Sequence, residues 1–243
     1  ATCGNIVYAS SFAMFAAGRA YEQVRNSIGY THLNVKICAT HAGITLGEDG
    51  ASHQSIEDIA LMRSIPGMTV LQPSDDIETK QMIKAISEFD GPCYVRLGRS
   101  AVETVNSEDY KFELGKGVVL REGKDITLIA TGMMVQEAMK ASSLLAEQGI
   151  EVSVINIHTI KPLDETLILD YAKKSKLVVT CEEHSKFGGL GSAVAETLSK
   201  NHPTKMAMVA VNDTFGESGT PAALIEKYGL TAKDIVATVL GSM

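Results

Sequence analysis

Hydrophobic positions along this chain switch repeatedly between the runs typical of strands and the three-to-four spacing typical of helices. Residues 5–9 form an apolar run that predicts a strand, and the apolar positions from Phe12 to Ile28 then fall on one helical face. Predicted strands at 34–38, 68–71 and 93–97 alternate with predicted helices at 56–65 and 74–89. Ser55, with Asp58 three residues on, and Ser74 are residue types that cap helices, so we expect these two helices to begin there.

A second alternation of the same kind fills the rest of the chain. The predicted strands lie near 117–120, 126–130, 152–155, 177–180 and 206–211, and the predicted helices near 134–148, 163–173, 191–200, 221–228 and 231–240. Residues 101–112, between the two alternations, are polar and acidic without an apolar period. This pattern is typical of parallel sheets covered by helices on both faces. We therefore predict an α/β fold of two three-layer α/β/α domains with mostly parallel sheets, at 1–104 and 117–243, joined by a linker at 105–116.

Composition and charge narrow the class of protein. The net charge of -7 comes from 29 acidic and 22 basic residues without a long block of either sign, which argues against a nucleic-acid surface. No apolar run approaches the roughly 20 residues of a membrane span, and no basic-then-apolar leader begins the chain. The four cysteines are widely spaced without a Cys-x-x-Cys pair, so we expect reduced thiols in a cytoplasmic protein and no metal bound by them.

The loop at 40–54, between a predicted strand and a predicted helix, is the first candidate site. It carries three glycines, at 43, 47 and 50, together with His41, Asp49 and His53. Glycine lets a backbone turn sharply and approach a ligand closely. Loops at the carboxyl end of sheet strands are where α/β proteins place their chemistry. A glycine-rich turn with solvated charges is the alternative, and the three polar side chains together favour a site.

Arg99 follows the predicted strand at 93–97, on the same edge of the sheet as this loop if the strands are parallel. Its guanidinium offers a planar fork of donors suited to phosphate, but a surface salt bridge accounts for the residue equally well. Arg96 alternates with it along the strand and points the other way, so it is the weaker candidate. Phe12 and Phe15, at helical spacing, are typical of core packing on the pattern alone.

Two stretches of the second half also carry polar or glycine-rich patterns. Residues 187–192 (FGGLGS) predict a tight strand-to-helix turn, because the full Gly-x-Gly-x-x-Gly spacing of phosphate-binding loops is absent. Glu182, Glu183 and His184 have metal-ligand chemistry. Adjacent residues on an extended segment point to opposite faces, so we do not predict a metal site there.

Two motifs resemble the signatures of one known family. Residues 47–54 (GEDGASHQ), with 56–57 and the run LMRSIP at 61–66, look like the central signature of transketolases. Residues 182–184 with GGLGSAVAE at 188–196 similarly resemble the signature of the transketolase carboxyl-terminal domain. The resemblance covers essentially the whole chain. It is closest to the separately encoded carboxyl-terminal half made by some microorganisms, which carries the pyrimidine-binding and carboxyl-terminal domains.

The resemblance implies a cofactor and a role for each candidate residue. Thiamine diphosphate would supply the carbanion chemistry, while the protein positions groups and moves protons. Phe12 would stack on the aminopyrimidine ring, and Phe15 would stand near it in place of the more usual tyrosine. His53 would be the catalytic histidine that contacts substrate hydroxyls and passes protons. Asp49 would read a donor hydroxyl, while His41 and Arg99 would hold the sugar phosphate.

Departures from the family pattern point to a partner. Ala51 and Ser52 replace the usual Pro-Thr, which keeps the hydroxyl. The family's catalytic glutamate belongs upstream of Ala1, so we expect the first domain to be incomplete at its amino terminus. The Gly-Asp-Gly and Asn pattern that holds magnesium and diphosphate is also missing. The resemblance therefore implies an amino-terminal transketolase subunit that binds Mg and diphosphate, a homodimer of this half, and no activity of this chain alone.

Three functions remain open at this point. The leading one is a split transketolase of the pentose phosphate pathway, moving a two-carbon ketol unit between sugar phosphates. The second is an enzyme like 1-deoxyxylulose-5-phosphate synthase, against which His41 argues, because that family usually has Asp-Arg at this point of the loop. The third is a non-catalytic scaffold subunit, which gives no physical reason to retain His41, Asp49, His53, Phe12 and Arg99 together.

Overall fold

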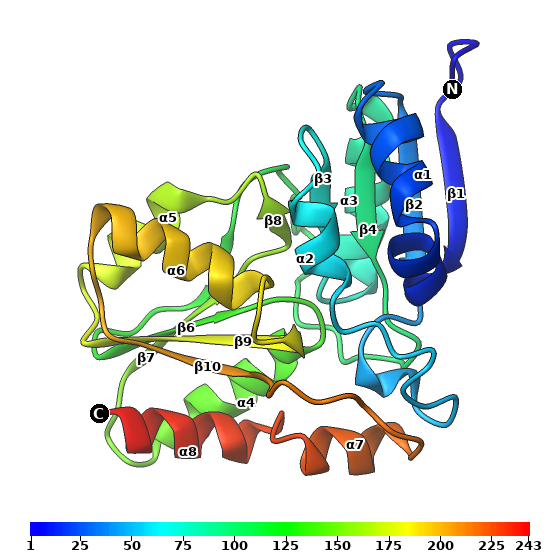
Figure 1. Cartoon of the computed structure of the whole chain (residues 1–243). Coiled ribbons are helices and arrows are strands. Elements are labelled where there is room, and N and C mark those ends of the chain that lie inside the picture. The colour runs from blue at the N-terminus through cyan, green and yellow to red at the C-terminus, as the bar shows by residue number, and fades with distance from the viewer.

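The computed structural model describes residues 1–243 and contains two five-stranded sheets. The strands of one sheet run across the direction of the strands of the other (Figure 1). The first has the strand order β1 (Val7–Phe12), β2 (Val35–Thr40), β4 (Cys93–Arg96), β3 (Thr69–Leu71) and β8 (Thr159–Lys161). The second has the order β10 (Met206–Val211), β9 (Leu177–Ser185), β6 (Ile126–Ala130), β7 (Val152–Asn156) and β5 (Val118–Arg121). Only β3–β8 and β5–β7 pair antiparallel. The predicted α/β fold with mostly parallel sheets is confirmed.

Helices cover both faces of each sheet (Figure 1). On the second sheet, α5 (Glu165–Ala172) and α6 (Leu190–Asn201) lie on one face, and α4 (Met134–Ala146) and α8 (Ala232–Ser242) lie on the other. On the first sheet, α3 (Asp76–Glu88) lies opposite η1 (Met14–Arg19), α1 (Tyr21–Gln23), η2 (Val24–Gly29) and α2 (Asp58–Arg63). The remaining elements are η3 (Ile44–Leu46) and α7 (Pro221–Lys227). No helix is both long and apolar enough to cross a membrane.

One hydrophobic core joins the two sheets. Ile37 of β2 and Met62 of α2 belong to the same buried cluster as Ile168 of α5 and Leu198 of α6. The central strands β6 and β7 are buried along their whole length, as expected for strands covered on both faces. Because apolar side chains of both halves share this core, the first sheet is held in a fixed position against the second.

The edge strand β1 carries the first aromatic residue of the candidate site. Four of its six residues are exposed, and it pairs in parallel with β2 alone. Phe12 is the last residue of β1, so the prediction that it begins a helix is wrong. The helical stretch after it divides into η1, α1 and η2 with wide turns, in which the Ala20 amide donates to the Phe15 carbonyl five residues back.

The two predicted helix caps differ in the structure. Helix α2 begins after Glu57, without a side-chain cap, because the Asp58 carboxylate bonds instead to the buried Tyr94 and Arg96. Helix α3 is capped by Asp75 rather than Ser74; the Asp75 side chain accepts a hydrogen bond from the Glu78 amide.

The three-residue strand β8 comes from the second half and completes the first sheet beside β3. Its shortness explains why the hydrophobic pattern did not reveal it.

Candidate functional site

Parallel pairing brings two candidate segments to one edge of the first sheet. Strand β2 ends at Thr40, just before His41, and strand β4 ends at Arg96, three residues before Arg99. The segment from His41 to Gln54, called the site loop below, folds over this edge and contains η3. Gln54 closes it, because its buried amide donates to the Ile44, Gly47 and Glu217 carbonyls. The loop is therefore anchored at its far end.

Four rings gather where β1 meets the site loop. The Phe12 ring stacks on the His41 imidazole with 4.0 Å between centroids and 10° between planes. Phe15 lies nearly parallel to Phe12 at 5.9 Å. The His53 ring meets both phenyl rings edge-on, at 6.3 Å from Phe12 and 5.2 Å from Phe15. We call these residues the four-ring cluster; all four are partly exposed, so a ligand can reach them.

Each histidine of the cluster has one ring nitrogen bonded to a neighbouring hydroxyl. Nδ1 of His41 lies 2.9 Å from Oγ1 of Thr40, and Nδ1 of His53 lies 2.9 Å from Oγ of Ser52. Neither Nε2 makes a hydrogen bond within the chain. These two atoms therefore remain free to bind a ligand or to accept and donate protons.

No hydrogen bond or ring contact joins Asp49 or Arg99 to the four-ring cluster. Asp49 is exposed at the tip of the site loop. The Arg99 guanidinium donates to the Leu46 carbonyl and to the Glu48 carboxylate, both at 2.6 Å, and its side chain is 45% exposed. The hydrogen bond from Arg99 lowers the pKa of Glu48. The structure thus shows the ion pair that the sequence left open, with half the arginine still accessible to an anion.

Arg96, Asp58 and Tyr94 form a buried polar network near the site loop. The hydrophobic pattern gave one sign of this network, the charged Arg96 inside an apolar strand. The Arg96 guanidinium lies 2.8 Å from the Asp58 carboxylate, and neither side chain is accessible. It also donates to the Ser55 and Glu183 carbonyls. Tyr94 donates to Asp58, and burial, followed by the Asp58 charge, raises the pKa of Tyr94. The Arg96 guanidinium is thus bonded to buried partners and makes no hydrogen bond to the four-ring cluster.

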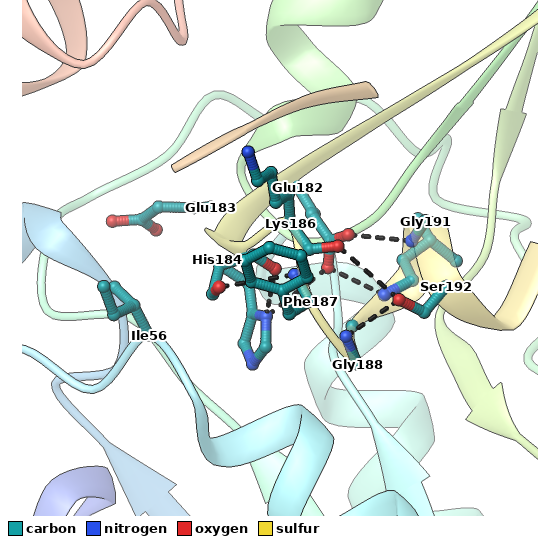
Figure 2. A network of polar contacts seen from close by, with 12 residues as sticks. Ile56, Glu182, Glu183, His184, Lys186, Phe187, Gly188, Gly191 and Ser192 are labelled. Atoms are coloured by element: carbon teal, nitrogen blue, oxygen red, sulfur yellow. Dashed lines mark hydrogen bonds and ion pairs between the residues drawn. The ribbon is translucent and has the colours of Figure 1, made fainter. Parts of the chain in front are cut away.

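The side chains of Glu182 and Glu183, near the end of β9, extend in opposite directions (Figure 2). The Glu182 carboxylate accepts the Leu190 and Gly191 amides at the start of α6, both at 2.7 Å. His184 donates from Nδ1 to the Ser185 carbonyl. Strand β9 passes into α6 through the predicted turn.

No three His, Cys, Asp or Glu side chains of the chain converge on a point where they could hold a metal ion.

A cavity of about 500 Å³ opens between the two domains, beside the site loop. Thr45 and Arg96 of the first domain line it together with Gly132 and Glu183 of the second. None of the residues predicted to bind cofactor or substrate lines it. The four-ring cluster therefore lies outside this cavity.

Comparison with known proteins identifies both halves of the chain. Residues 1–104 match the family model "Transketolase, pyrimidine binding domain", and residues 115–235 match "Transketolase, C-terminal domain". A Methanocaldococcus jannaschii protein, provisionally named as a transketolase C-terminal section, is 51% identical; the match covers 100% of this chain and 77% of that protein. The "6-deoxy-6-sulfo-D-fructose transketolase subunit" of a Clostridium species is 47% identical, over 97% of this chain and 73% of its own length.

A solved structure extends the likeness to three dimensions. The structure described as "Split gene transketolase, inactive beta4 tetramer" superposes with a TM-score of 0.94 at 53% identity, covering 99% of this chain and 77% of that one. The 1-deoxy-D-xylulose-5-phosphate synthase of Desulforudis audaxviator is less similar, at 40% identity. This chain covers only 35% of that enzyme.

Proposed function

The chain belongs to the transketolase family as the carboxyl-terminal half of a split transketolase, and we propose that it acts with thiamine diphosphate to move two-carbon ketol units between sugar phosphates. The observation that carries the proposal is the four-ring cluster, which combines two phenyl rings and two histidines with free Nε2 atoms at one sheet edge. A scaffold subunit would have no physical need for this combination of exposed aromatic and titratable groups.

The chemistry of the four-ring cluster fits the pyrimidine end of the cofactor. Thiamine diphosphate supplies a stabilised carbanion when bound, so the protein need only position groups and move protons. Phe12 and Phe15 are partly exposed and nearly parallel, an arrangement that suits stacking with a flat heteroaromatic ring. We also propose that Mg²⁺ and the diphosphate are held mainly by an amino-terminal subunit, as the resemblance to split transketolases implies.

The remaining residues would bind and orient the sugar. His53 has a free Nε2 beside Phe15 and would exchange protons with substrate hydroxyls. His41, Asp49 and the accessible part of Arg99 lie on the same sheet edge, where His41 and Arg99 would hold the phosphate and Asp49 a donor hydroxyl. We assign these roles by matching the motif residues at 41–53 and Arg99 with the family signature.

The proposed assembly is a homodimer of this half joined to its amino-terminal partner. The naming of relatives as a transketolase subunit or section supports an amino-terminal partner. The solved relative, described as an inactive β4 tetramer of a split-gene transketolase, supports association between copies of this half. Phe12 lies at the end of the exposed edge strand β1, where a second polypeptide can complete a cofactor site. Catalysis would then require both polypeptides.

Reconstitution with purified subunits tests the function. The chain is mixed with its amino-terminal partner, thiamine diphosphate and Mg²⁺, and transfer from xylulose 5-phosphate to ribose 5-phosphate is followed by product formation. We expect transfer only when both subunits are present. Formation of 1-deoxyxylulose 5-phosphate from pyruvate and glyceraldehyde 3-phosphate would support the synthase instead. No reaction with any sugar phosphate tested would support the scaffold.

A further inference from the structure

Glu183 reaches from the second domain into the site loop of the first. It lies near the end of β9 and is 3% exposed. Its Oε1 accepts a hydrogen bond from the Thr45 amide at 2.6 Å, although the two residues are 138 positions apart in the chain. Thr45 is the central residue of η3, within the site loop. A charge-assisted bond of this length is among the stronger hydrogen bonds in proteins.

The direction of Glu183 differs from that of its neighbours. Figure 2 shows the Glu182 side chain turned toward Gly191 and the start of α6, while the Glu183 carboxylate extends to the opposite side. Glu182 thus serves the fold of its own domain. The Glu183 side chain makes no hydrogen bond within its own domain, and its one hydrogen bond goes to the site loop.

The backbone of the site loop is shaped around this carboxylate. Gly43 has a φ of +86°, and a Cβ atom added there would lie 2.3 Å from the Glu183 Cδ. Any larger residue would displace the carboxylate or the loop. The main chain of Glu183 is held as well, because Arg96 donates to its carbonyl at 3.0 Å while pairing with Asp58. The carboxylate therefore occupies a fixed position against residues 43–45.

Burying a carboxylate costs free energy unless the carboxylate is paired or hydrogen-bonded. The hydrogen bond from the Thr45 amide offsets part of this cost for Glu183. Burial raises the pKa of Glu183, while the Arg96 charge and the Thr45 amide oppose that rise. The second domain supplies none of the residues assigned to substrate or cofactor. Its influence on the site must pass through contacts such as this one.

We propose that Glu183 is a positioning residue, whose buried carboxylate holds residues 43–45 so that the site loop presents His41, Asp49 and His53 in reactive geometry. The proposal rests on the proposed ketol transfer for its catalytic part. Its structural part stands on the Thr45 bond and the Gly43 contact alone. Through this residue, the second domain would set the shape of a site whose side chains all belong to the first.

Three variants test the role: Glu183→Ala, Glu183→Gln and the control Glu182→Ala. The first readout is hydrogen exchange of backbone amides in the chain alone. For Glu183→Ala we expect the Thr45 amide to exchange about tenfold faster or more, because it loses a charge-assisted bond. Glu183→Gln keeps an acceptor oxygen and should stay within about threefold of the native rate. Glu182→Ala should accelerate exchange at Leu190 and Gly191 and leave Thr45 unchanged.

The second readout is ketol transfer in the reconstituted complex. For Glu183→Ala we expect kcat/KM to fall about tenfold or more, since small misplacements of site groups are costly. Glu183→Gln should restore most of it, and Glu182→Ala should lower thermal stability without this loss. Native exchange at Thr45 in Glu183→Ala, or equal kinetic losses in the Glu182 and Glu183 variants, would overturn the proposal. If the native complex transfers no ketol group, the proposed function fails, and the exchange readout still decides whether Glu183 holds the loop.

Discussion

The imidazole of His41 lies flat on the phenyl ring of Phe12, with 4.0 Å between their centroids. Phe12 ends β1 and His41 follows β2, so parallel pairing of these two strands creates the contact. A residue assigned to the cofactor ring and a residue assigned to the sugar phosphate therefore support each other. Changes at Phe12 should affect both ligands.

Phe12→Leu tests this relationship. The leucine removes the flat aromatic surface, and aromatic pairs are worth about 0.5–1.5 kcal/mol beyond simple burial. We expect thiamine diphosphate to bind the reconstituted complex about threefold to tenfold more weakly, with a higher KM for sugar phosphates. Calorimetric titration of the cofactor and steady-state kinetics measure the two effects. Phe215→Leu, at a side chain that is 78% exposed, is the control; equal behaviour of the two variants would contradict the assignment.

His53→Ala should depress turnover while leaving the fold intact. Its Nδ1 bonds only to Ser52, and its ring contacts Phe12 and Phe15 by their edges, so little packing is lost. Loss of a general acid–base group lowers kcat by about 100-fold to 10,000-fold. Single-turnover kinetics and a melting curve separate the two effects. His202→Ala, at the carboxyl end of α6, is the matched control. Native turnover of His53→Ala would remove this histidine from the site.

The hydrophobic pattern predicted the alternation of strands and helices well, because parallel strands buried on both faces leave long apolar runs such as β6. It also predicted that His41 and Arg99 lie at the same edge of the first sheet, because this follows from the parallel pairing of β2 and β4. It failed where side chains from distant segments decide the outcome. Asp58 does not take its expected capping role, because its carboxylate pairs with the buried Arg96 guanidinium of strand β4.

The hydrogen bond between Glu183 and Thr45, which links the two domains, could not be predicted from the sequence either. Glu183 stands beside Glu182 in the same acidic pair, and only the direction of each side chain separates a helix cap from a contact with Thr45. Alternation along β9 indicates opposite faces but not what each face meets. The exact partners of Arg99 depend in the same way on the path of the loop, which three glycines leave undetermined by local preference.

Arg99→Ala tests the phosphate assignment. The native guanidinium is shared between Glu48 and the Leu46 carbonyl, yet remains 45% exposed. Loss of a charge-assisted contact to phosphate should raise KM for phosphorylated sugars about tenfold to 100-fold, with little change for unphosphorylated analogues. Glu48→Gln removes the competing carboxylate and should leave this KM equal or lower. If Arg99→Ala raises KM equally for both classes of sugar, the arginine does not read the phosphate.

The buried pair of Arg96 and Asp58 should dominate the stability of the first domain. Removing one partner leaves an uncompensated buried charge, so Arg96→Met and Asp58→Asn should each cost about 3–5 kcal/mol of unfolding free energy. The double variant should lose less than the sum of the two, because neither charge is then left alone. Urea unfolding of all four proteins measures the coupling. Strictly additive losses would show that the two side chains do not stabilise each other.

His158 should make stability fall on acidification. Its side chain is inaccessible beneath Phe112, with 4.4 Å between the ring centroids, and burial lowers the pKa of His158 from its usual 6.5. Unfolding releases the ring into water, where it takes up a proton. Its contribution to stability is therefore fully present above pH 6.5 and is lost as the pH falls through the lower pKa of the folded state.

The measurement is the slope of unfolding free energy against pH, compared between the native chain and His158→Gln. Each buried neutral histidine adds a slope of up to about 1.4 kcal/mol per pH unit below the unfolded pKa. We expect the native curve to be steeper than that of His158→Gln between about pH 6.5 and 5. His202→Gln, at a partly exposed histidine, should keep the native slope. Glu183 cannot produce this difference, since its pKa is raised and it is present in all three proteins. Parallel curves for the native chain and His158→Gln would mean that His158 does not contribute to acid sensitivity.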